Sequence, residues 1–130
     1  MIARPSLHYL DEQAIIENIV KNINAILIFR QTPLMFAIRS NYQSANPNNL
    51  PMILIENGAD IHAVDVFGKN AAHHLIKLHQ HRSNHSFLLE LLKLLINKGI
   101  NLDIYDIHGK TPFDYFSSES VRYNILRELE

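Results

Sequence analysis

A twelve-residue pattern occurs twice in the chain without gaps, and this internal repeat constrains the fold more than any other feature. Residues 58–69 read GADIHAVDVFGK and residues 99–110 read GINLDIYDIHGK, so Gly, Asp, Gly and Lys recur at one offset. An apolar residue recurs as well, at Ile61 and Leu102. Self-similarity at a fixed period indicates a repeat architecture, in which each unit buries its apolar face against the next.

Each copy contains the residues that helix ends and tight turns require. Gly58 and Gly99 follow an apolar helical run, where glycine takes the positive φ that ends a helix. Residues 65–68 and 106–109 begin with Asp and end with Gly, which is typical of a tight turn.

Helix starts follow the turns. Thr32 and Thr111 are suitable capping residues, and each precedes a proline, which loses no hydrogen bond at the first position of a helix. Each unit is therefore predicted to contain a turn, a short helix, a return helix and a glycine stop.

Short motifs flank these turns. A sequence like Thr-Pro-Leu-His-x-Ala occurs at 32–37 (TPLMFA), with degraded copies at 70–75 (NAAHHL) and 111–116 (TPFDYF). A sequence like Leu-Leu-x-x-Gly-Ala-Asp occurs at 54–60 (LIENGAD) and 95–101 (LINKGIN). In these motifs the chain resembles the ankyrin-repeat family.

The resemblance implies an all-α ankyrin-repeat solenoid, built of stacked helix-turn-helix units with short β-hairpin-like loops. We expect one domain over residues 1–130, of about four irregular units. These units are expected at 4–26, 27–64, 65–105 and 106–130.

The chain departs from the regular repeat at several places. The spacing between equivalent glycines exceeds the family's unit length of about 33 residues. The extra residues are expected between the paired helices, at 80–87, with a smaller insert at 42–46. Leu27 and Arg30 occupy the positions that Asp and Gly hold in the other turns, and Pro51 is expected to begin a shortened return helix.

Apolar residues mark the predicted core and its end. In the third unit's return helix they form a wide stripe that is expected to pack between units: Phe87, Leu88, Leu91, Leu92, Leu95 and Ile96. The last segment is apolar on one side only, as in a polar end cap of a repeat array. Its apolar residues are Val121, Ile125, Leu126 and Leu129.

The composition excludes several classes of protein. With 12 Lys and Arg against 13 Asp and Glu, the chain lacks the basic excess of a nucleic-acid binder or of an anionic-membrane binder. It has no cysteine, which excludes disulfides and thiolate metal sites. No signal-peptide core and no apolar run of bilayer-spanning length is present. We expect a cytoplasmic monomer without nucleic-acid or membrane partners.

Five histidines lie close together in the sequence: His73, His74, His79, His81 and His85. His81 with His85, or with His79, could bind zinc or nickel from a loop. No Asp, Glu or Cys joins them between residues 73 and 86, so we interpret them as solvated loop histidines. The resemblance further implies that His73 hydrogen-bonds the turn.

No set of nucleophile, base and acid is apparent, so we expect no enzyme activity, no cofactor and no metal. The ankyrin family usually binds partner proteins on a concave face, formed by the loop tips and the exposed side of each first helix. By position, the resemblance assigns partner binding to Ile28, Phe29, Gln31, Arg39, Val66, Phe67, Lys69, Lys77, Leu78, Tyr105, Ile107, His108 and Lys110.

Apolar residues at three successive loop tips favour an interface, because polar residues would otherwise be expected there. These tips are Ile28-Phe29, Val66-Phe67 and Ile107-His108, and the expected rim is Arg39, Lys69, Lys77 and Lys110. The alternative is that Phe29 and Phe67 pack on neighbouring loops.

We therefore predict a protein–protein interaction module. The first alternative is an ankyrin-type effector of an intracellular bacterium or virus, delivered into the host cytosol and acting on a host protein. A high content of Ile and Asn, with few Ala and only 4 Gly, fits the AT-rich genomes common in such organisms. The second alternative is a histidine-loop protein that responds to metal or pH.

Overall fold

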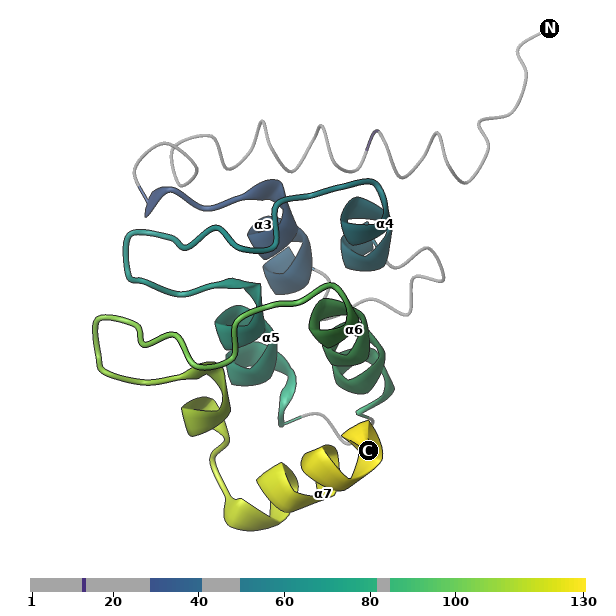
Figure 1. The fold of residues 1–130 in the computed structure, drawn as a ribbon, viewed down its shortest axis with the longest axis vertical. Helices are drawn as coiled ribbons and strands as arrows, with labels where there is room; N and C mark the ends of the chain where they lie inside the picture. The colour runs from purple at the N-terminus through teal and green to yellow at the C-terminus, as the bar shows by residue number, and fades with distance from the viewer. Residues whose placement is uncertain (1–12, 14–28, 41–49, 82–84) are drawn as a thin grey trace, which may run out of the picture.

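The computed structural model describes residues 13, 29–40, 50–81 and 85–130 of the chain (Figure 1). The described segments contain helices and turns and no β-strand. The named elements are α3 (Pro33–Ser40), α4 (Leu50–Glu56), α5 (Ala71–His79), α6 (Ser86–Asn97), the 3₁₀ helix η2 (Pro112–Tyr115) and α7 (Glu119–Leu129). Apart from residue 13, the predicted first unit lies outside the described residues, as do Ile28 and the predicted insert at 42–46.

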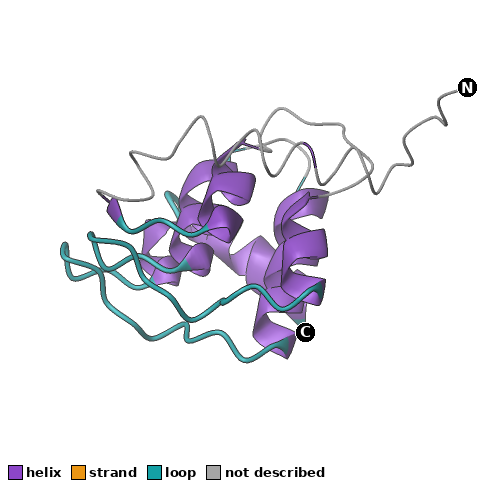
Figure 2. Cartoon of the chain, turned by 90° about the horizontal axis from the view of Figure 1, so that it is seen from above, coloured by secondary structure: helices purple, strands orange, loops and turns teal. Residues whose placement is uncertain are grey.

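The helices pack as successive pairs in two layers (Figures 1 and 2). In the first layer α3 packs against α5, and α5 packs against η2. In the second layer α4 packs against α6, and α6 packs against α7. The loops between the pairs project on one side of the molecule (Figure 2). The predicted all-α solenoid of stacked helix pairs is confirmed.

The core lies between the two layers. Leu75 and Ile76 of α5 are fully buried, together with Leu91, Leu92 and Leu95 of α6. The predicted apolar stripe is confirmed for the centre of α6.

The end of that stripe was predicted wrongly. Ile96, which we expected in the core, is 39% exposed. It lies within the last turn of α6, directly before the residues that end the helix at Gly99.

The helix boundaries agree with the sequence signals. Pro51 is the second residue of α4, and the link between α5 and α6 lies at 80–85, where extra residues were expected. Gly58 and Gly99 follow their helices with φ of 90° and 89°. The predicted glycine stops are therefore confirmed.

The turns repeat the same backbone conformation. Gly68 and Gly109 have φ of 78° and 73°, and Arg30, at the equivalent position, has φ of 60°. A positive φ at a non-glycine residue costs energy, and Arg30 adopts it even though the glycine signal is missing at its position.

Two matched glycine substitutions are expected to separate backbone conformation from close packing. Both Gly68 and Gly109 have positive φ, so alanine at either position should cost about 1–2 kcal/mol of unfolding free energy. A Cβ on Gly68 would lie 3.1 Å from Asp106 Cα, whereas one on Gly109 meets nothing within 4 Å. Gly68→Ala should therefore cost at least about 1 kcal/mol more in urea unfolding. Equal costs would contradict tight stacking of adjacent loops.

The fourth pair differs from the expected helix pair. Its first element, η2, is a single turn of 3₁₀ helix, and the Thr111 N–H donates to Asp114 Oδ2 at 2.9 Å at its start. Ser118 then caps α7 by accepting a hydrogen bond from the Val121 N–H at 3.2 Å. Because the next helix begins so soon, a full first helix has no room.

The last helix has the predicted end-cap character. Ile125 of α7 is buried, and Val121, Leu126 and Leu129 are half-buried. Arg127 on the same helix is exposed.

Candidate functional site

Two aspartates at equivalent positions shape the loops. Asp65 Oδ1 accepts hydrogen bonds from the N–H groups of Phe67 at 2.9 Å and Lys69 at 3.0 Å. Asp106 Oδ1 accepts from those of His108 and Lys110 at the same two distances. Each carboxylate thus closes its own turn, which explains why Asp recurs in the repeat.

The second carboxylate oxygen of Asp65, Oδ2, links its loop to α5 of the same unit and to the preceding loop. It lies 2.8 Å from His74 Nε2 of α5 and accepts from Gln31 Nε2 of the preceding loop at 3.4 Å.

Asp106 repeats this arrangement with different partners. Its Oδ2 accepts from the Tyr115 hydroxyl of its own unit and lies 3.2 Å from Lys69 Nζ of the preceding loop. Neighbouring units are therefore joined by equivalent polar contacts. The Gln31 amide donates to Asp65 in one case, and the Lys69 ammonium pairs with Asp106 in the other.

Backbone hydrogen bonds align the loop tips. The Val66 N–H donates to Phe29 O at 2.8 Å, and the Ile107 N–H donates to Phe67 O at 2.9 Å. This alignment brings the Phe29 and Phe67 rings into a stack, with centroids 5.7 Å apart. The two rings pack on each other, as the alternative interpretation predicts, and yet remain 39% and 38% exposed.

The charges at the Asp106 contact stabilise each other. Burial alone would raise the pKa of Asp106, but the bonds from Tyr115, the Lys110 N–H and Lys69 outweigh it and hold the pKa well below its ordinary range. Burial alone would lower the pKa of Lys69, and its bonds to Asp106 and Tyr115 raise it instead. The pair is therefore ionised at neutral pH.

His73 connects the start of α5 to the next loop. Its Nδ1 accepts from the Asn70 N–H at 3.0 Å, and its Nε2 lies 2.9 Å from Lys110 O. With Nδ1 as acceptor, Nε2 carries the hydrogen and donates it to the carbonyl. The expected bond between His73 and a turn is confirmed. Burial lowers the pKa of this imidazole.

His73 is expected to make the protein less stable in mild acid. In the unfolded chain the His73 imidazole takes up a proton near its ordinary pKa of 6.5, whereas in the folded protein it stays neutral to a lower pH. The free energy of unfolding should therefore fall as the pH drops from about 7.5 to about 5.5. Urea unfolding at both pH values measures the effect.

A His73→Gln variant is the control, and its stability should depend less on pH over this range. His74 beside Asp65 is present in both proteins, so the difference between the two profiles isolates His73. Parallel profiles would contradict this assignment.

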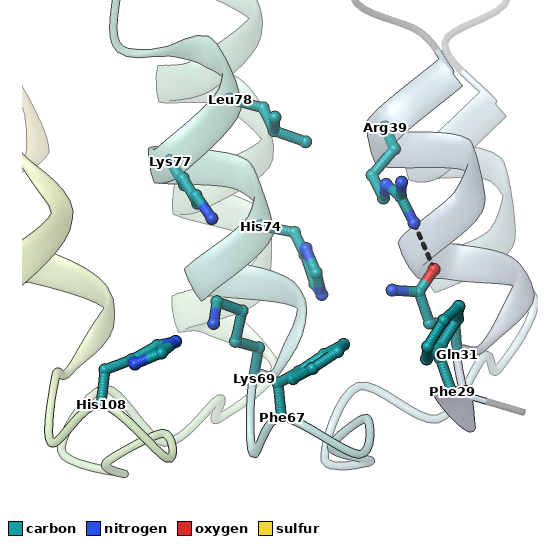
Figure 3. A pocket seen from close by; sticks show the side chains of 9 residues that line it. All are labelled: Phe29, Gln31, Arg39, Phe67, Lys69, His74, Lys77, Leu78 and His108. Carbon is teal, nitrogen blue, oxygen red and sulfur yellow. Dashed lines mark hydrogen bonds between the residues drawn. The ribbon is translucent and has the colours of Figure 1, made fainter. Parts of the chain in front are cut away.

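A pocket of about 360 Å³ opens between α3 and α5, beside the loop tips (Figure 3). Arg39 and Gln31 lie on one side of it, and Leu78 and His74 of α5 face them (Figure 3). The lining residues are Phe29, Gln31, Arg39, Phe67, Lys69, His74, Lys77, Leu78 and His108.

Eight of these nine were assigned to partner binding from the sequence, and the structure brings them together. Four other assigned residues are exposed outside the pocket lining: Val66, Tyr105, Ile107 and Lys110. The assigned Ile28 lies outside the described residues.

Lys69 was expected in the exposed rim of the interface, but the structure buries it. It is only 6% exposed and is held at Asp106. Gln31 is buried too, because it bonds to Asp65 and accepts a hydrogen bond from Arg39.

Sequence reasoning missed His74 as a lining residue and the two aspartates as links between units. The available signal was a polar residue nine positions after each repeated Asp, at His74 and Tyr115.

The histidines do not form the solvated loop that we expected. His73, His74 and His79 belong to α5 and are buried, and His79 Nε2 lies 2.9 Å from Ile38 O. His81 is exposed, and His85 Nε2 lies 3.1 Å from Gln80 O. Among the residues with described positions, no group of three His, Asp or Glu side chains is placed to hold a metal ion.

None of the helices in the described residues is both long enough and apolar enough to span a bilayer.

Comparisons with known proteins agree with this architecture. No protein-family model matches the chain. Over 61 residues, or 47% of the chain, it is 43% identical to ankyrin repeat protein OPG189 of variola virus, and a second variola virus sequence of that name matches equally. The match spans only 11% of those proteins.

A solved structure shows the same arrangement of helices. The ankyrin repeat domain of Bcl-3, a member of the IkappaB protein family, matches with a TM-score of 0.54 and 25% sequence identity. The match covers 75% of this chain and 36% of that chain.

Proposed function

Because the described part of the chain is an ankyrin-repeat domain, we propose that it is a protein–protein interaction module whose loop-tip and first-helix face binds a partner protein. The pocket between α3 and α5 carries this proposal, since it combines exposed apolar side chains with cationic ones. Phe29, Phe67 and Leu78 expose about two fifths of their surface there, at 39%, 38% and 41%. Exposed apolar surface with a polar rim is typical of an interface.

The proposal assigns no catalysis and no cofactor to this domain. The described groups nearest to a catalytic set are Asp65, Asp106, His73 and His74, and each is engaged in bonds that hold turns or join units. The proposal also specifies a cytoplasmic monomer whose partner is a protein rather than a nucleic acid or a membrane.

Site-specific photo-cross-linking tests the proposed face. A benzophenone amino acid replaces Leu78 in the pocket in one variant, and Ile96 on α6 in the matched control. The two residues are aliphatic and almost equally exposed, at 41% and 39%. We expect a discrete protein adduct from cell lysate at position 78 and none at position 96. Adducts at position 96 alone, or at neither position, would contradict the proposal.

The match to a viral ankyrin repeat protein favours a more specific version, in which the partner is a host protein. The same two variants are then used in a eukaryotic cell lysate and in a lysate of the source organism. An adduct at position 78 in the eukaryotic lysate supports the effector function, whereas an adduct in the source lysate alone overturns it.

A further inference from the structure

The pocket is cationic as well as apolar. Arg39, Lys69 and Lys77 line it together with two histidines, and no Asp or Glu is among the lining residues. Lys69 is neutralised by Asp106, whereas neither Arg39 nor Lys77 has an ion pair within the described residues. The bond from Arg39 goes to the neutral amide oxygen of Gln31 (Figure 3). Within the part of the chain that the structure describes, the lining therefore carries positive charge on Arg39 and Lys77 that no carboxylate pairs with.

Three ammonium groups gather around a single aromatic ring, and two of them, on Lys69 and Lys77, belong to residues of the pocket lining. The Nζ atoms of Lys69, Lys77 and Lys110 lie 5.5, 5.6 and 5.0 Å from the centroid of Tyr115. Among the described residues, Asp106 is the one carboxylate bonded to these side chains, through Lys69 and Tyr115. The positive charges of Lys77 and Lys110 therefore remain unpaired in the described structure. Like charges gathered around one ring repel each other, and an added carboxylate near Lys77 and Lys110 would relieve the repulsion.

We propose that the pocket binds an acidic segment of the partner protein, and this inference rests on the proposed function. One apolar side chain of that segment lies against Phe67 and Leu78, and a carboxylate lies near Lys77 and Lys110. The lining comes from three successive loops and from α3 and α5, which suits an extended segment running across the units. A volume of about 360 Å³ admits side chains of such a segment.

Charge and apolar surface together favour a peptide over a nucleic acid. The chain has a net charge of −1, whereas proteins that bind nucleic acid by charge present an extended basic surface. The stacked Phe29 and Phe67 rings offer apolar contact that suits an aliphatic or aromatic side chain.

Selection from a random peptide library displayed on phage tests this inference with the full 130-residue chain. We expect the enriched peptides to carry Asp or Glu beside an aliphatic or aromatic residue. A synthetic copy of the strongest peptide should bind less tightly as the salt concentration rises. Lys77→Glu should weaken that binding about tenfold or more.

The matched control is Lys93→Glu, which makes the same charge change at an exposed residue of α6 and should leave binding unchanged. Enriched peptides without acidic residues, bound equally by both variants, would overturn the acidic inference while leaving the proposed interface intact. Failure to enrich any peptide would also overturn it, and the cross-linking result at Leu78 would still decide the proposed function. Tighter binding of a single-stranded oligonucleotide than of the selected peptide would overturn it as well.

Discussion

Replacing Asp106 with asparagine is expected to lower the free energy of unfolding by about 3–5 kcal/mol, because it breaks a buried charge pair and leaves one partner uncompensated. The carboxylate accepts hydrogen bonds from two backbone N–H groups and from Tyr115, and it lies 3.2 Å from Lys69 Nζ. Asparagine keeps one oxygen for the turn but presents an amide N–H₂ to Lys69, which is itself a donor. The loss should appear as a fall in melting temperature of about 10 °C or more.

Asp103→Asn is the matched control, because Asp103 lies in the same loop and is exposed. It should change the unfolding free energy by less than about 0.5 kcal/mol. A Lys69→Met substitution in the Asp106→Asn background should recover part of the loss, since it removes the unpaired ammonium. A loss below about 1 kcal/mol for Asp106→Asn, or no coupling to Lys69, would contradict the role of this contact in joining units.

The parts of the fold that are local in sequence were predictable. The Asp-x-x-Gly turns, the capping residues and the glycine stops each depend on a few consecutive residues, so the repeated motif identified them. The residues assigned to partner binding came from the family resemblance, and eight of them line the pocket because equivalent residues of stacked units lie side by side.

The contacts between units could not be predicted in the same way. Lys69 reads as a surface lysine, yet the next unit places Asp106 beside it and buries it. His79 reads as part of a polar loop, but α5 continues through it and Ile38 O of the preceding pair meets its ring. In both cases the deciding partner belongs to another unit, which one-dimensional patterns do not identify.

Phe67→Asp is expected to weaken partner binding by at least about 2 kcal/mol, or about thirtyfold. Phe67 lines the pocket at the loop tips and stacks on the Phe29 ring, and large aromatic residues carry much of the binding energy in interfaces (Figure 3). An acidic side chain there would also repel the carboxylate that we propose for the partner.

The same substitution should cost the fold only about 1 kcal/mol, because the ring is 38% exposed and the bonds of Phe67 to the neighbouring loop come from its backbone. Binding is measured by titration of the peptide selected with the wild-type chain, or of the partner captured at Leu78, and stability by urea unfolding. Ile96→Asp, at an equally exposed residue of α6, should leave binding unchanged. If Phe67→Asp instead unfolds the protein, the ring belongs to the core and the interface must lie elsewhere.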